Sequence, residues 1–313
     1  MTNRTLILAV AAVLLFGAVS FYAYTIFHKT APLPPQEATS TATQADVQKE
    51  PQGPAHEVIG TSVQGRTIDA YTYGPEGSST DIMFVGGMHG GYEWNSVLLA
   101  YDFMDYLAST TDAIPKGMRI TVIPSANPDG VYAVLKKEGR FTLAEAPTAA
   151  DPSGLGRFNA DKVDLNRNFD CNWKPTSTWQ NKTVSAGTAA FSEPEAQAIK
   201  YAVEKYHPAA VVFWHSQADA VYASECHNGV LPATIDVMNA YAKAAGYPAV
   251  KSFDAYPITG DAEGWLASIN IPAITVEMKT HASVEWDKNL SGIKALIAYF
   301  QKRESTDSAT VSK

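Results

Sequence analysis

The chain has 313 residues, with 24 Lys and Arg against 32 Asp and Glu, and carries a net charge of −8 at pH 7. This length fits one large α/β domain or two small ones. The negative charge argues against nucleic acid as a partner, because phosphate backbones are bound by basic surfaces.

The first predicted element is a membrane helix over residues 6–27. No residue from Leu6 to Phe27 is charged. At about 1.5 Å per residue, a helix over this run spans the ~30 Å hydrocarbon core of a bilayer. A cleavable signal peptide has a shorter apolar core followed by a small-residue site, which Tyr22–Phe27 fits poorly. We therefore expect an uncleaved signal anchor. The protein would be secreted if the segment were cleaved.

The composition changes after this run and gives the remaining boundaries. Residues 28–55 are rich in Pro, Thr and Ala without an apolar period, which predicts a flexible linker. The next part is long enough to bury a sizeable core and is expected to be a single catalytic domain. The predicted organisation is a short tail at 1–5, the anchor at 6–27, the linker at 28–55, the domain at 56–303 and a disordered tail at 304–313.

Within the domain, strand-like and helical patterns alternate. Residues 58–62 and 67–73 flank Gln64-Gly65 and predict a hairpin. Further strands are expected at 82–85, 119–124, 210–214 and 273–277, and helices at 96–108, 193–205, 233–245, 260–267 and 288–301. Ser192 and Pro194 are typical of a helix start. Buried strands alternating with helices predict an α/β fold with a mixed, mostly parallel twisted sheet covered on both faces.

Three residues with metal-binding side chains follow two of these strands. His89 and Glu93 come after the apolar run 82–85, and His215 ends the run 210–214. In such sheets, ligands bind beyond the carboxyl ends of the strands. Two imidazoles and one carboxylate form a catalytic zinc site that leaves a fourth position for water. The alternative for Glu93 is that it stabilises the positive N-terminus of the next helix.

Taken in order, the motifs of the domain resemble those of the zinc metallocarboxypeptidases of the carboxypeptidase A type. The matches are His89…Glu93, Asn127-Pro-Asp-Gly, Asp164-Leu-Asn-Arg-Asn-Phe, Ser192-Glu-Pro-Glu, His215-Ser, Tyr256 and Glu277. The resemblance implies a bacterial-type member with one Zn²⁺ per chain, bound by His89, Glu93 and His215. The family usually spaces the first two ligands as His-x-x-Glu, whereas this chain has His-x-x-x-Glu through Gly90 and Gly91. Two glycines can absorb the extra residue in a tight turn.

The same resemblance implies the catalytic and binding residues. Glu277 would be the general base that takes a proton from the attacking water. Asn166 and Arg167 would bind the substrate's terminal carboxylate, for which a guanidinium fork is suited. Arg157 would polarise the scissile carbonyl, with Arg140 as its alternative, and Tyr256 would close over the bound terminus.

Glu263 lies seven residues after Tyr256, where the pancreatic enzymes of this family place the residue at the base of the specificity pocket. An acid there would favour a Lys, Arg or diaminopimelate-like residue at the cleaved end. The alternative is a solvated helix residue. Cys171 and Cys226 could pair in an extracytoplasmic domain, and His207, His227 and His281 are expected to be structural.

The predicted function is that of a membrane-anchored zinc metallocarboxypeptidase acting on peptides outside the cytoplasm, at the cell surface or in the periplasm. Cell-wall stem peptides are the candidate substrates for such an anchored enzyme, by fold-level analogy. One alternative is a zinc deacylase or amidase on the same fold. Another is a non-catalytic module that binds peptide termini, although the complete ligand and base set argues against it.

Overall fold

The computed structural model describes residues 53–149, 151–254 and 256–311. The chain divides into two units at residues 50 and 51, and every described element belongs to the second, residues 51–313. The predicted anchor at 6–27 and nearly all of the predicted linker lie outside the described residues. Over the ranges that are described, no helix combines the length and the apolar character needed to cross a bilayer.

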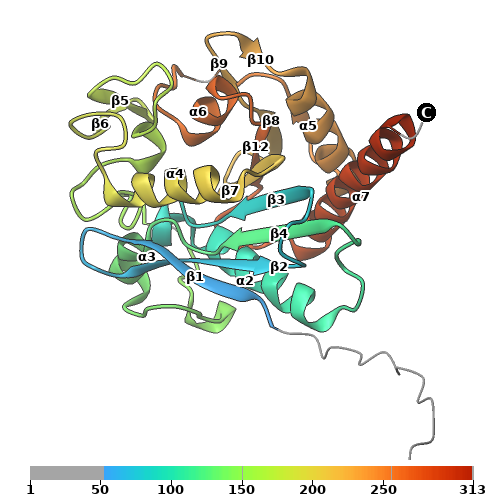
Figure 1. Cartoon of the computed structure of the whole chain (residues 1–313). Helices are drawn as coiled ribbons and strands as arrows, with labels where there is room; N and C mark the ends of the chain where they lie inside the picture. The colour runs from blue at the N-terminus through green and yellow to red at the C-terminus, as the bar shows by residue number, and fades with distance from the viewer. Residues whose placement is uncertain (1–52, 150, 255, 312–313) are drawn as a thin grey trace, which may run out of the picture. The chain divides into compact units, whose positions relative to one another are not determined.

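A mixed eight-stranded sheet forms the centre of the second unit, in the order β1-β2-β4-β3-β7-β12-β8-β11 (Figure 1). Its strands are β1 Ala55–Thr61, β2 Thr67–Tyr73, β3 Thr80–Val85, β4 Met118–Ile123, β7 Ala210–Ser216, β8 Ala220–Ala223, β11 Ala249–Val250 and β12 Ala273–Met278. The neighbours β4, β3, β7 and β12 run parallel, and β1 and β2 form the expected antiparallel hairpin. The mostly parallel sheet expected from the sequence is therefore confirmed.

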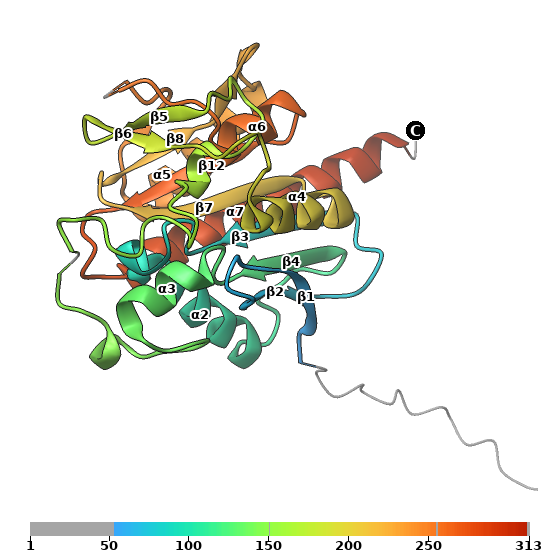
Figure 2. The ribbon, with the colours of Figure 1, turned by 90° about the vertical axis from the view of Figure 1, so that its left-hand side faces the viewer.

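Helices cover both faces of the sheet (Figures 1 and 2). The helices are α2 Trp94–Ser109, α3 Pro128–Leu135, α4 Pro194–Tyr206, α5 Pro232–Ala245, α6 Ala262–Ser268 and α7 Trp286–Val311, with short 3₁₀ turns η1 Gly90–Glu93, η2 Leu143–Glu145 and η3 Leu165–Arg167. One apolar core packs the sheet against α2, α5 and α7, and the other packs it against α4 and α6.

Strand alternation decides which side chains point to each core. Along β7, Val212 and Trp214 join the core under α2, α5 and α7, whereas Val211 and Phe213 join the core under α4 and α6. Because side chains alternate between the two faces of a strand, His215 lies on the same face as Val211 and Phe213. The sheet therefore presents His215 on the face that α6 covers.

The same alternation places two polar residues of β12. Ile274, Val276 and Met278 belong to the core under α2, α5 and α7. Thr275 and Glu277 consequently point to the opposite face, toward α6. In the parallel register, Glu277 is paired directly with His215. Two residues that are 62 positions apart in the sequence are thus brought side by side by strand pairing.

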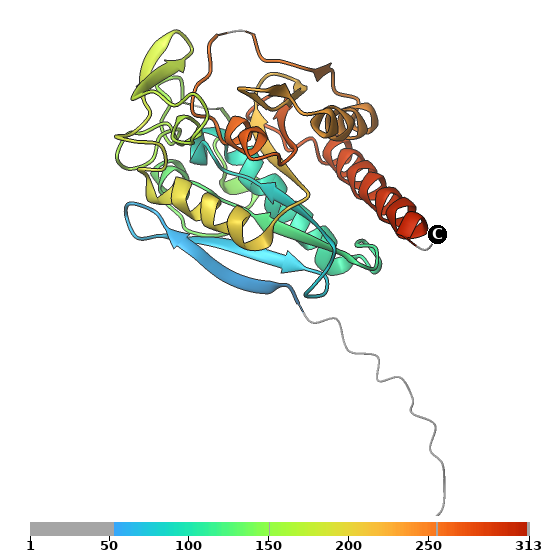
Figure 3. The ribbon, with the colours of Figure 1, turned by 45° about the horizontal axis from the view of Figure 1, so that its top comes forward.

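Two local expectations differ from the structure. Glu193, not Ser192, is the N-cap residue of α4, and the Ser192 hydroxyl donates to the Glu193 carboxylate at 2.7 Å. Helix α7 continues to Val311, where a disordered tail from residue 304 was expected, and Ser79 Oγ donates to Glu304 Oε1 at 2.5 Å. The long stretch 141–190 contains a small hairpin of β5 Thr176–Trp179 and β6 Lys182–Ser185. This hairpin lies at the other end of the unit from the C-terminal end of α7 (Figure 3).

Cys171 and Cys226 form a disulfide bond, so the expected pairing is confirmed. Cys226 belongs to a second small hairpin, β9 Glu225–Cys226 and β10 Gly229–Val230. Cys171 follows η3 and the Asn-Arg-Asn motif by a few residues. The bond therefore joins the loop after η3 to the region that follows β8.

Replacing both cysteines with serine is expected to lower the free energy of unfolding by up to about 4 kcal/mol, the loop-entropy value for cysteines 55 positions apart. The measurement is urea unfolding of the wild type and the double variant, each with and without a thiol reductant. The reductant should destabilise the wild type and leave the double variant unchanged. Equal stability of all four samples would contradict the prediction.

Candidate active site

Every residue that the sequence predicted for the site lines one cavity of about 500 Å³. They are His89, Glu93, Arg157, Asn166, Arg167, His215, Tyr256, Glu263 and Glu277. The cavity lies beyond the carboxyl ends of β3 and β7, where parallel sheets bind ligands. Residues from six separated stretches of the chain thus reach one space.

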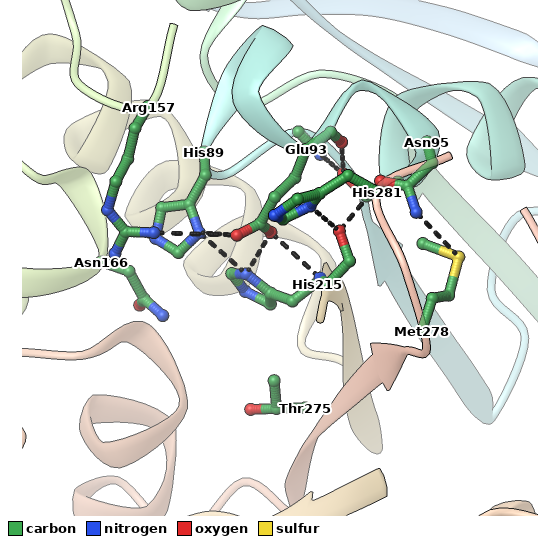
Figure 4. A network of polar contacts seen from close by, with 12 residues as sticks. His89, Glu93, Asn95, Arg157, Asn166, His215, Thr275, Met278 and His281 are labelled. Atoms are coloured by element: carbon green, nitrogen blue, oxygen red, sulfur yellow. Dashed lines mark hydrogen bonds and ion pairs between the residues drawn. The ribbon is translucent and has the colours of Figure 1, made fainter. Parts of the chain in front are cut away.

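The three predicted metal ligands point toward one another (Figure 4). His89 Nδ1 lies 2.8 Å from Glu93 Oε1, and His215 Nδ1 lies 3.0 Å from Glu93 Oε2. The two Nδ1 atoms are 3.1 Å apart. Ligand atoms around a tetrahedral zinc ion, at bond lengths of 2.0–2.1 Å, are about 3.3 Å apart. The spacing of these side chains therefore fits a zinc ion.

The outer nitrogens of both imidazoles support the same interpretation. His89 Nε2 faces Asp164 Oδ1 and His215 Nε2 faces Glu263 Oε1, each at 3.5 Å. Both nitrogens are buried and have no hydrogen-bond partner among the described residues. Imidazoles that bind a metal through one nitrogen typically direct the other toward a carboxylate. The arrangement of each histidine thus matches that of a zinc ligand.

The unusual His-x-x-x-Glu spacing has a local structural cause. The residues between the two ligands form the 3₁₀ turn η1, and Glu93 stands at the junction of η1 with α2. Gly90 has a φ of +47°, which favours glycine. A Cβ on Gly91 would lie 2.6 Å from Val134 Cβ and 2.7 Å from the Gly130 carbonyl oxygen. The glycines let the turn pack against α3 while both ligands face the cavity.

Charge interactions in the site are strong because the groups are buried. Burial opposes ionisation of Glu93, but His89 and His215 hold the pKa of its carboxyl well below the usual range. Burial likewise opposes ionisation of Asp164, and the charge of Arg157 keeps the pKa of Asp164 well below normal. At Glu277, burial and then the charge of Glu93 raise the pKa to about 8. Glu277 is the residue of this group whose environment favours a bound proton.

Arg157 is held rigidly at the cavity wall. Its Nε and Nη2 donate to Asp164 Oδ2 at 3.1 and 2.8 Å, and its guanidinium lies 4.6 Å from the centre of the Trp179 ring. Its Nη1 is 3.7 Å from Glu93 Oε1. Arg157 is 3 % exposed. The alternative, Arg140, instead pairs with Asp105 in an exposed contact and does not line this cavity.

The predicted carboxylate-binding pair lies in η3. Asn166 Oδ1 accepts the Ala262 backbone N–H at 2.8 Å, so its Nδ2 group is left as the donor. Arg167 donates through Nη1 to the backbone carbonyl of Asn166 and through Nη2 to the backbone carbonyl of Thr178. Its buried Nε has no hydrogen-bond partner among the described residues. Tyr256 packs on Phe253 with ring centres 4.9 Å apart at the cavity edge. The Cys171–Cys226 bond also lines the wall.

Sequence reasoning missed three residues of the site. Asp164 was noticed only as part of a motif, and Asp261 was not singled out. His281 was expected to be merely structural, yet it lines the cavity. Its Nδ1 lies 2.6 Å from Ser216 Oγ, and this hydroxyl donates to Asn95 Oδ1. His281 is thereby linked through Ser216 of β7, the strand that carries His215, to Asn95 of α2 (Figure 4). No signal in the sequence marks His281, because its partners come from distant segments.

Comparison with known proteins gives a family match over most of the chain. The zinc carboxypeptidase family matches residues 41–294. Murein peptide amidase A of Escherichia coli K12 is 26% identical over 242 residues, which cover 74% of this chain and 84% of that protein. The catalytic chain of human carboxypeptidase N is 28% identical over 210 residues, covering 63% of this chain and 40% of that protein.

Solved structures share the fold. The murein-tripeptide amidase of E. coli O157 aligns with a TM-score of 0.58 and 24% identity, covering 83% of this chain and 98% of that one. Bovine thrombin-activatable fibrinolysis inhibitor, in complex with tick carboxypeptidase inhibitor, aligns with a TM-score of 0.62 and 18% identity, covering 81% and 92%. At these identities the likeness concerns the fold.

Gly91→Ala should distort the ligand turn, because the added methyl group would overlap Val134 and the backbone of Gly130. We expect a loss of about 1–3 kcal/mol in the free energy of unfolding and a weakened affinity for zinc. The matched control is Gly53→Ala, since a Cβ at Gly53 meets nothing within 4 Å. Urea unfolding and chelator competition for zinc measure the two effects. Identical behaviour of both variants would contradict this account of the turn.

Zinc affinity should depend on pH because the metal must displace a proton. Burial disfavours the charged imidazole, but the charge of Glu93 raises the pKa of His215 to about 10. The neutral imidazole is the form that binds zinc, so binding releases this proton at any pH below about 10. The apparent affinity should rise about tenfold per pH unit between pH 6.5 and 8.5 for one proton released. Chelator competition at three pH values tests this, and a pH-independent affinity would contradict it.

Proposed function

The chain belongs to the zinc carboxypeptidase family, and on that premise we propose that it is a zinc-dependent carboxypeptidase that removes C-terminal residues from peptides. The observation that carries the proposal is the meeting of His89, Glu93 and His215 in one cavity with Glu277 and Arg167. A ligand triad, a general base and a carboxylate receptor together make up the parts that such a reaction needs.

Glu277 has the position and environment of a general base. A bound zinc ion would polarise the scissile carbonyl and make water more acidic. The Glu277 carboxylate, next to His215 in the β7–β12 register, would take the proton of the attacking water and hand it to the leaving amine. Its raised pKa suits both steps, since a base must accept the proton and later release it near neutral pH.

Arg157 would stabilise the negative charge that develops on the carbonyl oxygen. Asp164 already occupies its Nε and Nη2, and the Trp179 ring lies against the guanidinium plane. Such a fixed donor needs no reorganisation when charge develops, which is the basis of oxyanion stabilisation. The Nη1 group remains as the donor that can serve this purpose.

Asn166 and Arg167 would hold the free carboxylate of the substrate. Both are buried at the cavity wall and keep donors that no described residue uses, Asn166 Nδ2 and Arg167 Nε. A carboxylate bound there would place the last peptide bond near the zinc ligands and make the enzyme an exopeptidase. Tyr256, at the cavity edge, would close over the bound residue.

Two buried acids at the start of α6 support a preference for a basic terminal residue. Asp261, the N-cap residue of α6, and Glu263 both line the cavity. Burial and then the neighbouring Glu263 charge raise the pKa of Asp261 to about 6, so the pair would gain from a cation nearby. A Lys, Arg or diaminopimelate side chain would supply one. Cell-wall stem peptides offer such residues and are the substrate class we favour.

A second candidate is an amidase that cleaves an amide within murein peptides. Its support is the similarity to murein peptide amidase A, which extends over 84% of that protein. The same ligand triad, base and carboxylate receptor would serve both reactions. The two differ only in which amide bond of the bound peptide lies at the metal. A single peptide panel can distinguish them.

We also propose that the catalytic unit works outside the cytoplasm, attached through the predicted anchor at 6–27. The Cys171–Cys226 disulfide supports this location, because disulfides persist in oxidising compartments. The anchor remains a prediction from the sequence.

Glu277→Gln should lower peptide hydrolysis by about 10²–10⁴-fold, because the amide cannot accept the proton of water. Zinc content should stay at that of the wild type, since Glu277 is not among the clustered ligands. The purified full-length chain would be tested by elemental analysis and by mass spectrometry of peptides ending in Lys, Arg, Leu, Phe and diaminopimelate, with a murein tripeptide added.

Loss of single terminal residues, with Lys or diaminopimelate preferred, supports the carboxypeptidase. Cleavage of the murein tripeptide alone supports the amidase. Zinc binding without cleavage of any peptide would contradict both.

A further inference from the structure

Glu263 lines the cavity and also contacts one of the predicted zinc ligands. It is 3 % exposed, and its Oε1 is 3.5 Å from His215 Nε2. The contact is on the far side of the imidazole from Nδ1, the atom that faces Glu93. Glu263 therefore touches a predicted zinc ligand from behind.

A second residue fixes the orientation of this carboxylate. Thr275 Oγ1 donates to the same Glu263 oxygen at 3.0 Å. Thr275 points to the α6 face because it alternates with Ile274 and Val276 on β12. Helix α6 supplies the carboxylate, β12 supplies the hydroxyl and β7 supplies the histidine. The three groups thus form a chain that runs from the sheet and α6 to the metal position.

The other zinc-ligand histidine has a matching arrangement. His89 Nε2 faces the buried Asp164 Oδ1, also at 3.5 Å. Asp164 also pairs with Arg157, whereas the side-chain contacts of Glu263 within the described residues are with His215 and Thr275. Each imidazole therefore has its own carboxylate behind it, and the two carboxylates come from different parts of the chain.

We propose that Glu263 is a positioning residue for the metal centre, an inference that rests on the proposed zinc-dependent function. Its carboxylate keeps the proton of His215 on Nε2, so that Nδ1 presents its lone pair to the metal. It also fixes the plane of the ring. Partners of this kind raise the basicity of a ligand and its metal affinity. Any effect of Glu263 on terminal-residue preference is then separate from its effect on zinc.

The test measures zinc affinity of the full-length chain by chelator competition, together with the visible spectrum after Co²⁺ substitution. Glu263→Gln should weaken zinc binding about tenfold and Glu263→Met up to about 100-fold. Thr275→Val, which removes only the orienting hydroxyl, should weaken it by about threefold, as expected for one modest hydrogen bond. The Co²⁺ spectrum should change in both Glu263 variants.

Glu225→Gln is the matched control, because Glu225 lines the same cavity and is not among the residues that contact either ligand histidine. It should bind zinc as the wild type does. If Glu263→Met fails to fold, as judged by circular dichroism, Glu263→Gln and Thr275→Val decide the question. In parallel, the ratio of Lys to Leu release is measured for every variant that binds zinc.

Unchanged zinc affinity and an unchanged Co²⁺ spectrum in Glu263→Gln would overturn the proposal, whatever happens to the Lys to Leu ratio. A changed ratio with unchanged affinity would leave Glu263 with a specificity role alone. A wild type that binds no zinc would refute the proposed function itself and the inference with it. Weakened binding confined to the Glu263 and Thr275 variants would support the positioning role.

Discussion

Buried negative charge at the carboxyl edge of the sheet is the constraint on which the site depends. The carboxylates of Glu93, Asp164 and Glu263 are almost wholly inaccessible to solvent. A buried charge is costly unless it is paired. Arg157 and the two histidines neutralise part of this negative charge, and a divalent cation between the imidazoles and Glu93 would neutralise more of it. The electrostatics of the site therefore favour a metal independently of the family to which the chain belongs.

The sheet meets this constraint through simple geometry. Parallel pairing of β7 with β12 sets Glu277 beside His215. Because side chains alternate between the two faces of a strand, both of these side chains point toward α6. The turn after β3 brings His89 and Glu93 to the same edge. On the opposite face, Val212 and Trp214 of β7 and Ile274, Val276 and Met278 of β12 are apolar and fill the core. The polar groups of the site thus lie at one end of strands whose other side chains mostly pack in the core.

The cavity walls are formed by less regular segments, and separate contacts hold each of these segments in place. The disulfide joins the loop after η3 to the β9–β10 hairpin, and Trp179 of β5 packs on Arg157. The disulfide thus fixes the segment that directly follows Asn166 and Arg167, and Trp179 restrains Arg157. The carboxylate receptor proposed for Asn166 and Arg167 would need such fixation, because misplacement of the bound peptide by about 1 Å lowers the rate of reaction strongly.

The sequence by itself determined the alternating fold class and the strands of the sheet apart from the short β8 and β11, because apolar periodicity is a local property of the chain. The order of its motifs identified nine of the residues that line the cavity, but not Asp261 or His281. The sequence also indicated that Gly90 and Gly91 would absorb the unusual spacing. Only the tertiary structure decided that Glu263 lies behind His215 and that His281 joins the site. These contacts link segments far apart in sequence, and their distances follow from how α6 packs on the sheet, which no local pattern encodes.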